Sequence, residues 1–228
     1  LLFWQGAFQK RTLIGGWSLL EMRSYYLLGV IAMSVLMAHI EILVAYHDIK
    51  EGEIAARLLK PISYLWTMVA LETPWRVIQG LIGVVTVFAF IAFGVHIQFT
   101  DNLEKIVFGV VISIGAFLVS YFLKMCTGIL AFWFTDINAL LETQEVLILV
   151  FSGYIMPVDL LPWNLYNISM FTPFPYIIYY PIKAFLGTLS IDQMIRIVIV
   201  QWVWILLLYG VFKILWKRGV YKFSGVGQ

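Results

Sequence analysis

Long stretches without a single charged residue are the feature that most limits what this chain can fold into. Residues 77–95 contain no Asp, Glu, Lys or Arg, and the same holds for residues 106–123 and 197–212. An apolar segment of about 20 residues is long enough to cross the hydrocarbon core of a bilayer as a helix. A helix is also favoured there because it satisfies its own backbone hydrogen bonds. The sequence therefore predicts an all-α integral membrane protein.

The composition of the whole chain agrees with this prediction and excludes several other classes. Of the 228 residues, 62% are hydrophobic and 12% are charged, whereas soluble domains have about 45–50% and about 25%. A soluble domain of this size has no interior large enough to bury so many apolar side chains. The net charge of +2 is too small to indicate a polyanionic partner such as a nucleic acid. The single cysteine, Cys126, can form neither an intrachain disulfide nor a thiolate metal site.

The hydrophobic pattern predicts six spans in a single transmembrane domain, residues 1–228. The first span is expected to be incomplete, because Leu1-Leu2-Phe3-Trp4 resembles the outer end of a helix that begins upstream. Capping-box spacing marks two later helix starts, Ser18 with Glu21 and Ser190 with Gln193. The predicted spans are approximately residues 1–9, 23–46, 77–95, 105–134, 138–156 and 195–216.

Two regions interrupt this pattern for different reasons. Residues 47–76 begin polar and charged and continue with an aromatic-rich stretch around Pro74, so we expect a loop outside the bilayer. Residues 157–190 stay apolar, but prolines divide them into pieces too short to cross a bilayer. We expect these pieces to form a re-entrant hairpin on the outer side. The distribution of Lys and Arg places the 47–76 loop and the basic Lys217–Lys222 segment in the cytoplasm.

Three motifs follow one another along the chain. The first is Gly15-Gly16-Trp17-Ser18, which leads into Tyr25-Tyr26-Leu27. The second is Ile49-Lys50-Glu51-Gly52-Glu53-Ile54, followed by Leu58-Leu59-Lys60-Pro61-Ile62-Ser63-Tyr64. The third is Phe151-Ser152-Gly153-Tyr154-Ile155-Met156-Pro157, followed by Leu161-Pro162 and Pro173-Phe174. In this order they resemble the permease subunits of type-2 ABC exporters, in the branch of small six-span permeases encoded separately from their ATPase.

The resemblance implies a transport role for this chain. In such exporters two permeases, identical or sister subunits, form the substrate pathway, and each binds an ATPase subunit through the loop between its second and third helices. The resemblance assigns coupling to Ile49, Glu51, Gly52, Glu53, Arg57, Leu58, Leu59, Lys60 and Pro61. It assigns the outer re-entrant hairpin to Ser152, Gly153, Pro157, Leu161, Pro162 and Pro173. Lys50 and Lys60 stand where the family usually has Arg, which keeps the charge and loses the bidentate geometry.

The resemblance also implies that the energy for transport comes from another polypeptide. The chain has no G-x-x-x-x-G-K-[ST] motif, so it cannot bind a nucleotide phosphate by that route. ATP and Mg²⁺ are therefore expected in the partner ATPase, with no cofactor and no enzyme activity in this chain. The expected location is the bacterial cytoplasmic membrane. The cargo stays open, because lipids, amphipathic drugs, peptides and glycans all travel through such permeases.

Several ionisable residues fall inside the predicted spans: His39, Glu41, Lys124, Glu142 and Glu145. A charged side chain at the centre of a membrane helix costs roughly 2.5–3.5 kcal/mol on insertion scales, so such residues are functional candidates. We take Lys124, Glu142 and Glu145 as candidate pathway residues. The alternative for the two glutamates is that they complement the dipole at the start of the fifth helix. The alternative for Lys124 is that it snorkels or pairs with a neighbouring helix.

Two other functions are compatible with a polytopic membrane protein. A proton-coupled secondary transporter would show an inverted repeat with charged residues near the middle of spans in both halves, and no repeat stands out. An integral membrane enzyme would show a catalytic motif at one interface. Ser152 lacks the glycine two residues earlier that a nucleophile elbow requires. The three histidines are too scattered to predict a metal site.

Overall fold

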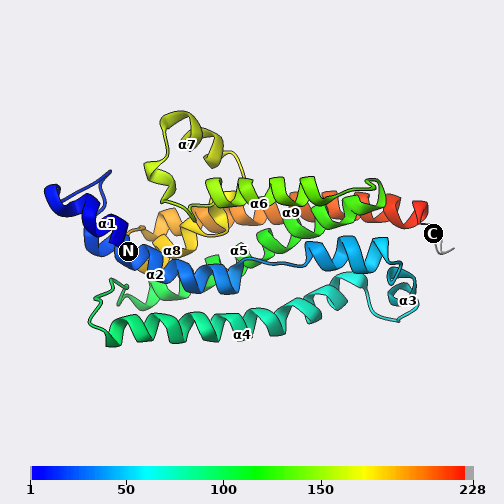
Figure 1. Ribbon diagram of the computed structural model, residues 1–228, viewed down its shortest axis with the longest axis horizontal. Helices are drawn as coiled ribbons and strands as arrows, with labels where there is room; N and C mark the ends of the chain where they lie inside the picture. The colour runs from blue at the N-terminus through cyan, green and yellow to red at the C-terminus, as the bar shows by residue number, and fades with distance from the viewer. Residues whose placement is uncertain (1, 224–228) are drawn as a thin grey trace.

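The computed structural model describes residues 2–223, and the regular secondary structure of this part of the chain is helical (Figure 1). Four of the described helices are long and apolar enough to cross a membrane. They are α2 (Leu19–Leu36), α4 (Tyr64–Ala92), α5 (Leu103–Ile129) and α9 (Ile191–Lys222). The protein therefore has the all-α membrane architecture that its uncharged stretches predict.

Two of the six predicted spans are shorter than a bilayer. The helix α6 (Asn138–Phe151) lies along the bundle in Figure 1, and its 14 residues extend ~21 Å. The hydrocarbon core is about 30 Å thick. The first predicted span corresponds to α1 (Leu2–Ala7) and the 3₁₀ turn η1 (Phe8–Lys10), while Leu1 lies outside the described residues. The described chain thus has four helices long enough to span a membrane and the shorter α6, where the sequence predicted five complete spans after a partial first one.

The second predicted span, residues 23–46, is not one continuous helix. The helix α2 ends at Leu36, residues 37–40 have no regular structure, and the π-helical segment η2 (Leu43–Lys50) follows. The sequence gives no sign of this break, because residues 37–40 are as apolar as their neighbours apart from one histidine. Side chains from other helices bind the backbone where the span breaks.

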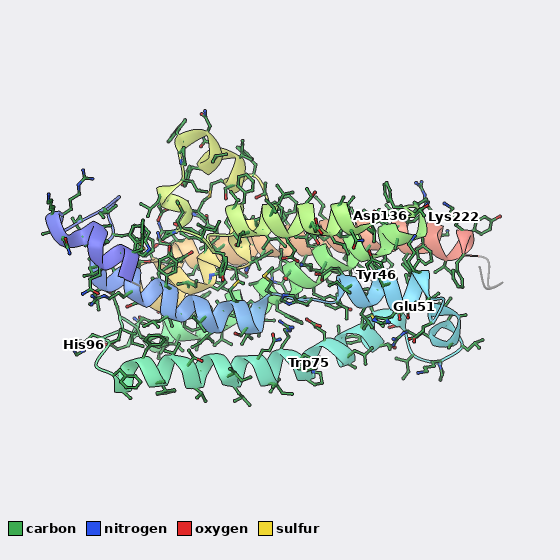
Figure 2. The ribbon with its side chains drawn as sticks, viewed as in Figure 1. Tyr46, Glu51, Trp75, His96, Asp136 and Lys222 are labelled. Atoms are coloured by element: carbon green, nitrogen blue, oxygen red, sulfur yellow. The ribbon has the colours of Figure 1, made fainter. Side chains whose placement is uncertain are left out.

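The predicted loop at residues 47–76 is shorter than expected, because α4 begins at Tyr64. The residues that favour a loop in the sequence, Glu72, Pro74 and Arg76, all lie inside this helix. A proline within a helix removes one backbone hydrogen bond and bends it, and α4 changes direction near Trp75 (Figure 2). The remaining loop is residues 51–63, which include the short helix α3 (Ile54–Leu58).

The outer region consists of short helical elements separated by prolines. The helix α6 ends at Phe151, earlier than the predicted 156, and Gly153 then adopts a φ of +89° that favours glycine. The elements that follow are η4 (Val158–Leu160), α7 (Trp163–Met170), η5 (Phe174–Tyr176) and α8 (Tyr179–Leu186). None of them exceeds eight residues, so none crosses a bilayer alone. The position of this region relative to the membrane stays a prediction.

The helix α5 is the central element of the bundle. It packs along α9 and also contacts α2 and α8. Gln201 of α9 is buried and donates hydrogen bonds to the carbonyls of Ile112 in α5 (2.9 Å) and Tyr176 in η5 (3.1 Å). Its amide fits against α5 because residue 115 is a glycine, where a Cβ would lie 2.5 Å from the Gln201 Oε1.

The loop that holds α3 and the end of α9 lie at the same end of the bundle (Figure 1). The turn between α5 and α6 lies there as well, whereas α1 and the turn between α4 and α5 lie at the opposite end. This arrangement agrees with the predicted even number of crossings between residues 51–60 and 217–222. Which end faces the cytoplasm stays a prediction.

Candidate functional site

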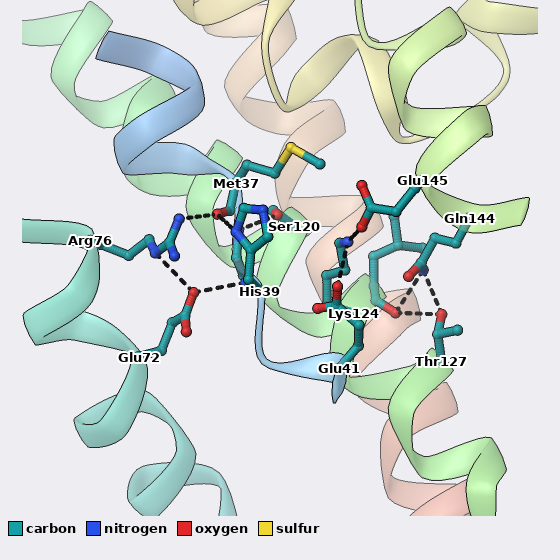
Figure 3. A network of polar contacts seen from close by, with 12 residues as sticks. Met37, His39, Glu41, Glu72, Arg76, Ser120, Lys124, Thr127, Gln144 and Glu145 are labelled. Carbon is teal, nitrogen blue, oxygen red and sulfur yellow. Dashed lines mark hydrogen bonds and ion pairs between the residues drawn. The ribbon is translucent and has the colours of Figure 1, made fainter. Parts of the chain in front are cut away.

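The irregular segment at residues 37–40 lies inside the bundle and is held by side chains from α4 and α5 (Figure 3). Non-helical backbone at membrane depth is tolerated only where protein or water satisfies its polar groups. The supporting hydrogen bonds join Ala38 N–H to Ser120 Oγ (2.9 Å), His39 N–H to Glu72 Oε1 (2.8 Å), and Arg76 Nη1 to the Met37 carbonyl oxygen (2.8 Å). The second span can therefore unwind here because three side chains replace its helical bonds.

Glu72 and Arg76 form an ion pair one helical turn apart in α4. The Arg76 Nε lies 3.0 Å from the Glu72 Oε1, and both residues are buried, at 6% and 5% exposure. Neither charge would be stable alone at this depth, and pairing compensates both. The pair thus lies inside the bundle, whereas the sequence predicted a loop outside the bilayer for both residues.

Lys124 of α5 lies between two carboxylates (Figure 3). Its side chain is fully buried, and its Nζ lies 2.8 Å from the Glu41 Oε1 and also contacts the Glu145 carboxylate of α6. Of the candidate pathway residues, the structure brings Lys124 and Glu145 together. Glu142 is exposed and lies outside this group. Lys124 pairs with neighbouring segments, which is the alternative to a pathway role that the sequence left open.

A close approach of backbones places Glu41 beside Lys124. Gly128 follows Lys124 by one turn, and a Cβ at Gly128 would lie 2.9 Å from the Glu41 carbonyl oxygen and 3.0 Å from the Val44 Cβ. Only glycine therefore lets the start of η2 lie directly on α5. The same glycine brings the Glu41 side chain within reach of the buried ammonium group.

The polar groups around Lys124 are not all satisfied. Gln144 donates through its Nε2 to Thr127 Oγ1, but the Gln144 Oε1 and the Glu41 Oε2 are buried without a hydrogen-bond partner among the described residues. Three acidic side chains, Glu41, Glu72 and Glu145, share this region with two basic side chains, Arg76 and Lys124. The site therefore holds two acceptor oxygens that could bind a further hydrogen-bond donor.

A second polar group fixes the loop at the end of the bundle. Asp48 of η2 is fully buried, and its carboxylate accepts hydrogen bonds from Arg57 Nε (2.6 Å) and Tyr64 OH (2.5 Å). Burial raises the pKa of the Asp48 carboxyl, whereas the hydrogen bond from Tyr64 and the charge of Arg57 lower it. This group, which we call the Asp48 clamp, ties η2 to α3 and to the first residue of α4.

The clamp divides the predicted coupling residues into two sets. Ile49 is buried in the bundle, and Arg57 turns inward to Asp48, so neither presents its side chain for docking as expected from the sequence. The remaining side chains are accessible, with Leu58 at 42%, Leu59 at 88% and the adjacent Ile62 at 58% exposure. The exposed polar or proline residues of the predicted set are Glu51, Glu53, Lys60 and Pro61, while Gly52 is half-buried with a φ of +84°.

The residues predicted for the outer hairpin lie at its turns. The carbonyl of the buried Ser152 accepts from Tyr179 N–H (3.0 Å), and the Gly153 carbonyl accepts from Tyr25 OH (2.5 Å). Leu161 is half-buried against the outer part of the core. Prolines directly precede the three short elements η4, α7 and η5: Pro157, Pro162 and Pro173. A hollow of about 600 Å³ lies beside this hairpin and is lined by α2, Phe90 and residues 153–155.

The family model described as ABC-2 family transporter protein matches residues 1–227. The chain belongs to this family. It is therefore an integral membrane transport permease, and the broken second span, the exposed loop and the outer hairpin are parts of a permease. No curated protein and no solved structure is significantly similar to it.

Proposed function

We propose that this permease is the membrane subunit of an ATP-driven exporter in the bacterial cytoplasmic membrane. Two permeases form the substrate pathway, and a separate ATPase subunit, which binds ATP and Mg²⁺, docks on the loop of each. The observation that carries this proposal is the exposed apolar group at the end of the bundle, Leu58, Leu59 and Ile62. Apolar side chains at the tip of a polar loop are explained by a partner surface that covers them.

Through the Asp48 clamp, a displacement of the loop would be transmitted to the neighbouring helices. A docked ATPase would contact α3, and Arg57 joins α3 to η2 while Tyr64 joins α4 to the same carboxylate. Because the bonds to a buried charge are short and directional, the three elements move together. A push on α3 would therefore reach both η2 and α4.

The polar group around residues 37–40 and Lys124 lies next to the helices that such a displacement would move. The segment η2 leads directly into residues 37–40, whose backbone is held by Glu72 and Arg76 of α4. Lys124 joins this region to α6 through Glu145. We infer that these ion pairs rearrange as the pathway opens and closes, so Lys124 and Glu145 act as pathway residues and Glu142 does not.

The test of coupling replaces Leu58 and Leu59 together by Asp. Two carboxylates without partners in an apolar docking surface should abolish ATPase binding, since burying each costs several kcal/mol. The variant should insert normally, because both positions are exposed. The matched control is Leu13→Asp, an exposed leucine (58%) in the segment between η1 and α2. Co-purification of the ATPase and transport-stimulated ATP hydrolysis are measured on the same preparations.

The outcome separates this proposal from its main alternative. Loss of association in the double variant and retention in the control support ATPase coupling through α3. Unchanged association and turnover in both variants would contradict it. If the permease in vesicles instead moved cargo on a pH gradient without ATP, the Glu41–Lys124–Glu145 group would carry a proton and the chain would be a secondary transporter.

A further inference from the structure

The last turns of α9 carry a concentrated positive charge. Lys213, Lys217, Arg218 and Lys222 are all exposed, and residues 209–223 contain no Asp or Glu. Among the described residues, none of these four cations has an acidic partner within 4.0 Å. Lys213 does lie over the Tyr209 ring, with its Nζ 5.4 Å from the ring centre. The charges are therefore available to an external anion.

The position of these cations matches the headgroup layer of a membrane. Lys213 directly follows the uncharged stretch at residues 197–212, and Lys217 lies one turn further on the same face. One helical turn advances about 5.4 Å, so the two lysines follow each other closely along the helix just beyond its uncharged stretch. Cations clustered immediately beyond a span attract anionic lipid headgroups.

A hollow on the surface of α9 lies beside the two lysines. It is an open depression and is lined by Lys213, Ile214, Trp216, Lys217 and Val220. The lining combines two cations with an aliphatic and aromatic wall. A phospholipid offers both complements, a phosphate for the lysines and a glycerol and acyl segment for the apolar wall.

The hollow is also connected to the Asp48 clamp. The Trp216 ring stacks on the Tyr64 ring, with centres 4.2 Å apart and an angle of 20° between the planes. Tyr64 donates its hydroxyl to Asp48, which in turn binds Arg57 of the loop. A ligand that orders Trp216 would therefore also order the base of α4 and the loop.

We propose that the hollow between Lys213 and Lys217 binds an anionic phospholipid of the leaflet that faces the α3 end, and that this lipid stabilises the loop. The lipid phosphate lies between the two ammonium groups, and Trp216 packs against its glycerol and upper acyl region. Binding of the lipid requires only the permease and does not depend on the proposed ATPase partner. Only the assignment of this leaflet to the cytoplasm, and the effect on coupling, rest on the proposed function.

The experiment measures lipid binding by the purified permease without any ATPase. Phosphatidylglycerol or phosphatidylcholine is titrated in detergent, and bound lipid is counted by native mass spectrometry while the thermal midpoint is followed. Phosphatidylglycerol should bind and raise the midpoint, and Lys213→Gln/Lys217→Gln should weaken its binding roughly tenfold or more. Lys213→Arg/Lys217→Arg should keep it. The matched control is Arg196→Gln, which removes an exposed cation near the other end of the same helix.

The possible results either support or overturn the site. Selective loss in the double Gln variant, with retention in the Arg variant and the control, supports it. Equal phosphatidylglycerol binding in all variants, or equal binding of phosphatidylcholine, overturns it. A separate co-purification with the ATPase adds one outcome: loss of association in the double Gln variant with unchanged lipid binding would show that these cations bind the ATPase, and it overturns the site too. The Leu58→Asp/Leu59→Asp variant should bind the lipid normally, so failure of the coupling proposal is recognised separately.

Discussion

Lys124 shows how a single charge is accommodated at the centre of this bundle. Its fully buried ammonium group contacts carboxylates from two other segments, Glu41 and Glu145. Removing one partner of a buried pair leaves the other charge uncompensated, which costs far more than removing both. The contribution of Lys124 is therefore tested by comparing single and double variants.

Lys124→Met should lower the free energy of unfolding by about 3–5 kcal/mol, because Glu41 stays buried without its cation. Adding Glu41→Gln to this variant should restore part of the loss. The measurement is the thermal midpoint of the purified permease in detergent. Glu142→Gln is the control and should change stability by less than about 0.5 kcal/mol, since Glu142 is exposed. Equal stability of Lys124→Met and the wild type would contradict the pairing.

The Asp48 clamp predicts a specific dependence on pH. In Arg57→Gln the pKa of Asp48 should rise further, because the positive partner that lowers it is gone. Below about pH 3.9 the carboxyl is protonated in the folded and the unfolded state, so the Arg57→Gln effect is small. As the pH rises, the unfolded state ionises first, and the folded variant loses stability relative to the wild type.

The measurement for Asp48 is the difference in thermal midpoint between the wild type and Arg57→Gln at several pH values from 4 to 7. This difference should grow with pH. The control is the difference between Asp48→Asn and Asp48→Asn/Arg57→Gln, which should be nearly constant with pH because neither variant has a titrating carboxyl at this position. A pH-independent difference in Arg57→Gln itself would refute the clamp.

At the scale of elements, the break in the second span depends on contact between η2 and α5. Gly128 allows this contact, because its missing side chain makes room for the Glu41 backbone. The contact has two consequences. It places Glu41 next to Lys124, and it positions η2 so that Asp48 meets Arg57 and Tyr64 at the end of the bundle.

Gly128→Ala should destabilise the permease by about 1–3 kcal/mol, because the new Cβ forces η2 away from α5. The matched control is Gly210→Ala in α9, where a Cβ would meet nothing within 4 Å. That substitution should be neutral or stabilising by about 0.5–1 kcal/mol, since alanine favours a helix over glycine. Thermal midpoints of the two variants decide between these outcomes, and a stable Gly128→Ala would rule out the tight contact.

At the scale of the whole molecule, the arrangement of the ends is the main expectation still to be measured. The loop with α3 and the end of α9 share one end of the bundle (Figure 1). The proposed function places this end in the cytoplasm. Labelling of single cysteines in intact cells measures this directly, in a Cys126→Ser background.

Lys60→Cys should be inaccessible to a membrane-impermeant maleimide added from outside and should react after the membrane is opened. Lys60 suits labelling because its side chain is exposed. Leu13→Cys, in the exposed segment between η1 and α2, is the control and should react from outside. Reaction of Lys60→Cys from outside would invert the proposed topology.

The sequence alone determined the class of the protein and the positions of its longest helices. Long uncharged stretches predicted α4, α5 and α9, because the cost of burying charge in a membrane is paid locally, residue by residue. The capping boxes at Ser18 and Ser190 are both formed as predicted, since a cap involves residues three positions apart. The apolar residues Leu58 and Leu59 are exposed at the tip of the loop, consistent with the expected docking role.

Only the tertiary structure decided where the second span breaks and which charges meet. The side chains that hold residues 37–40 come from positions 33 to 82 residues away, so no local pattern reports them. Glu72 and Arg76 were expected in a surface loop and Arg57 on a docking surface, because their charges favour solvent unless the fold supplies partners. Glu72 and Arg76 pair with each other within α4 and bind the backbone of residues 37–40, whereas Arg57 turns inward to Asp48 of η2. Hydrophobicity acts on each residue by itself, whereas pairing requires two residues that the fold brings together.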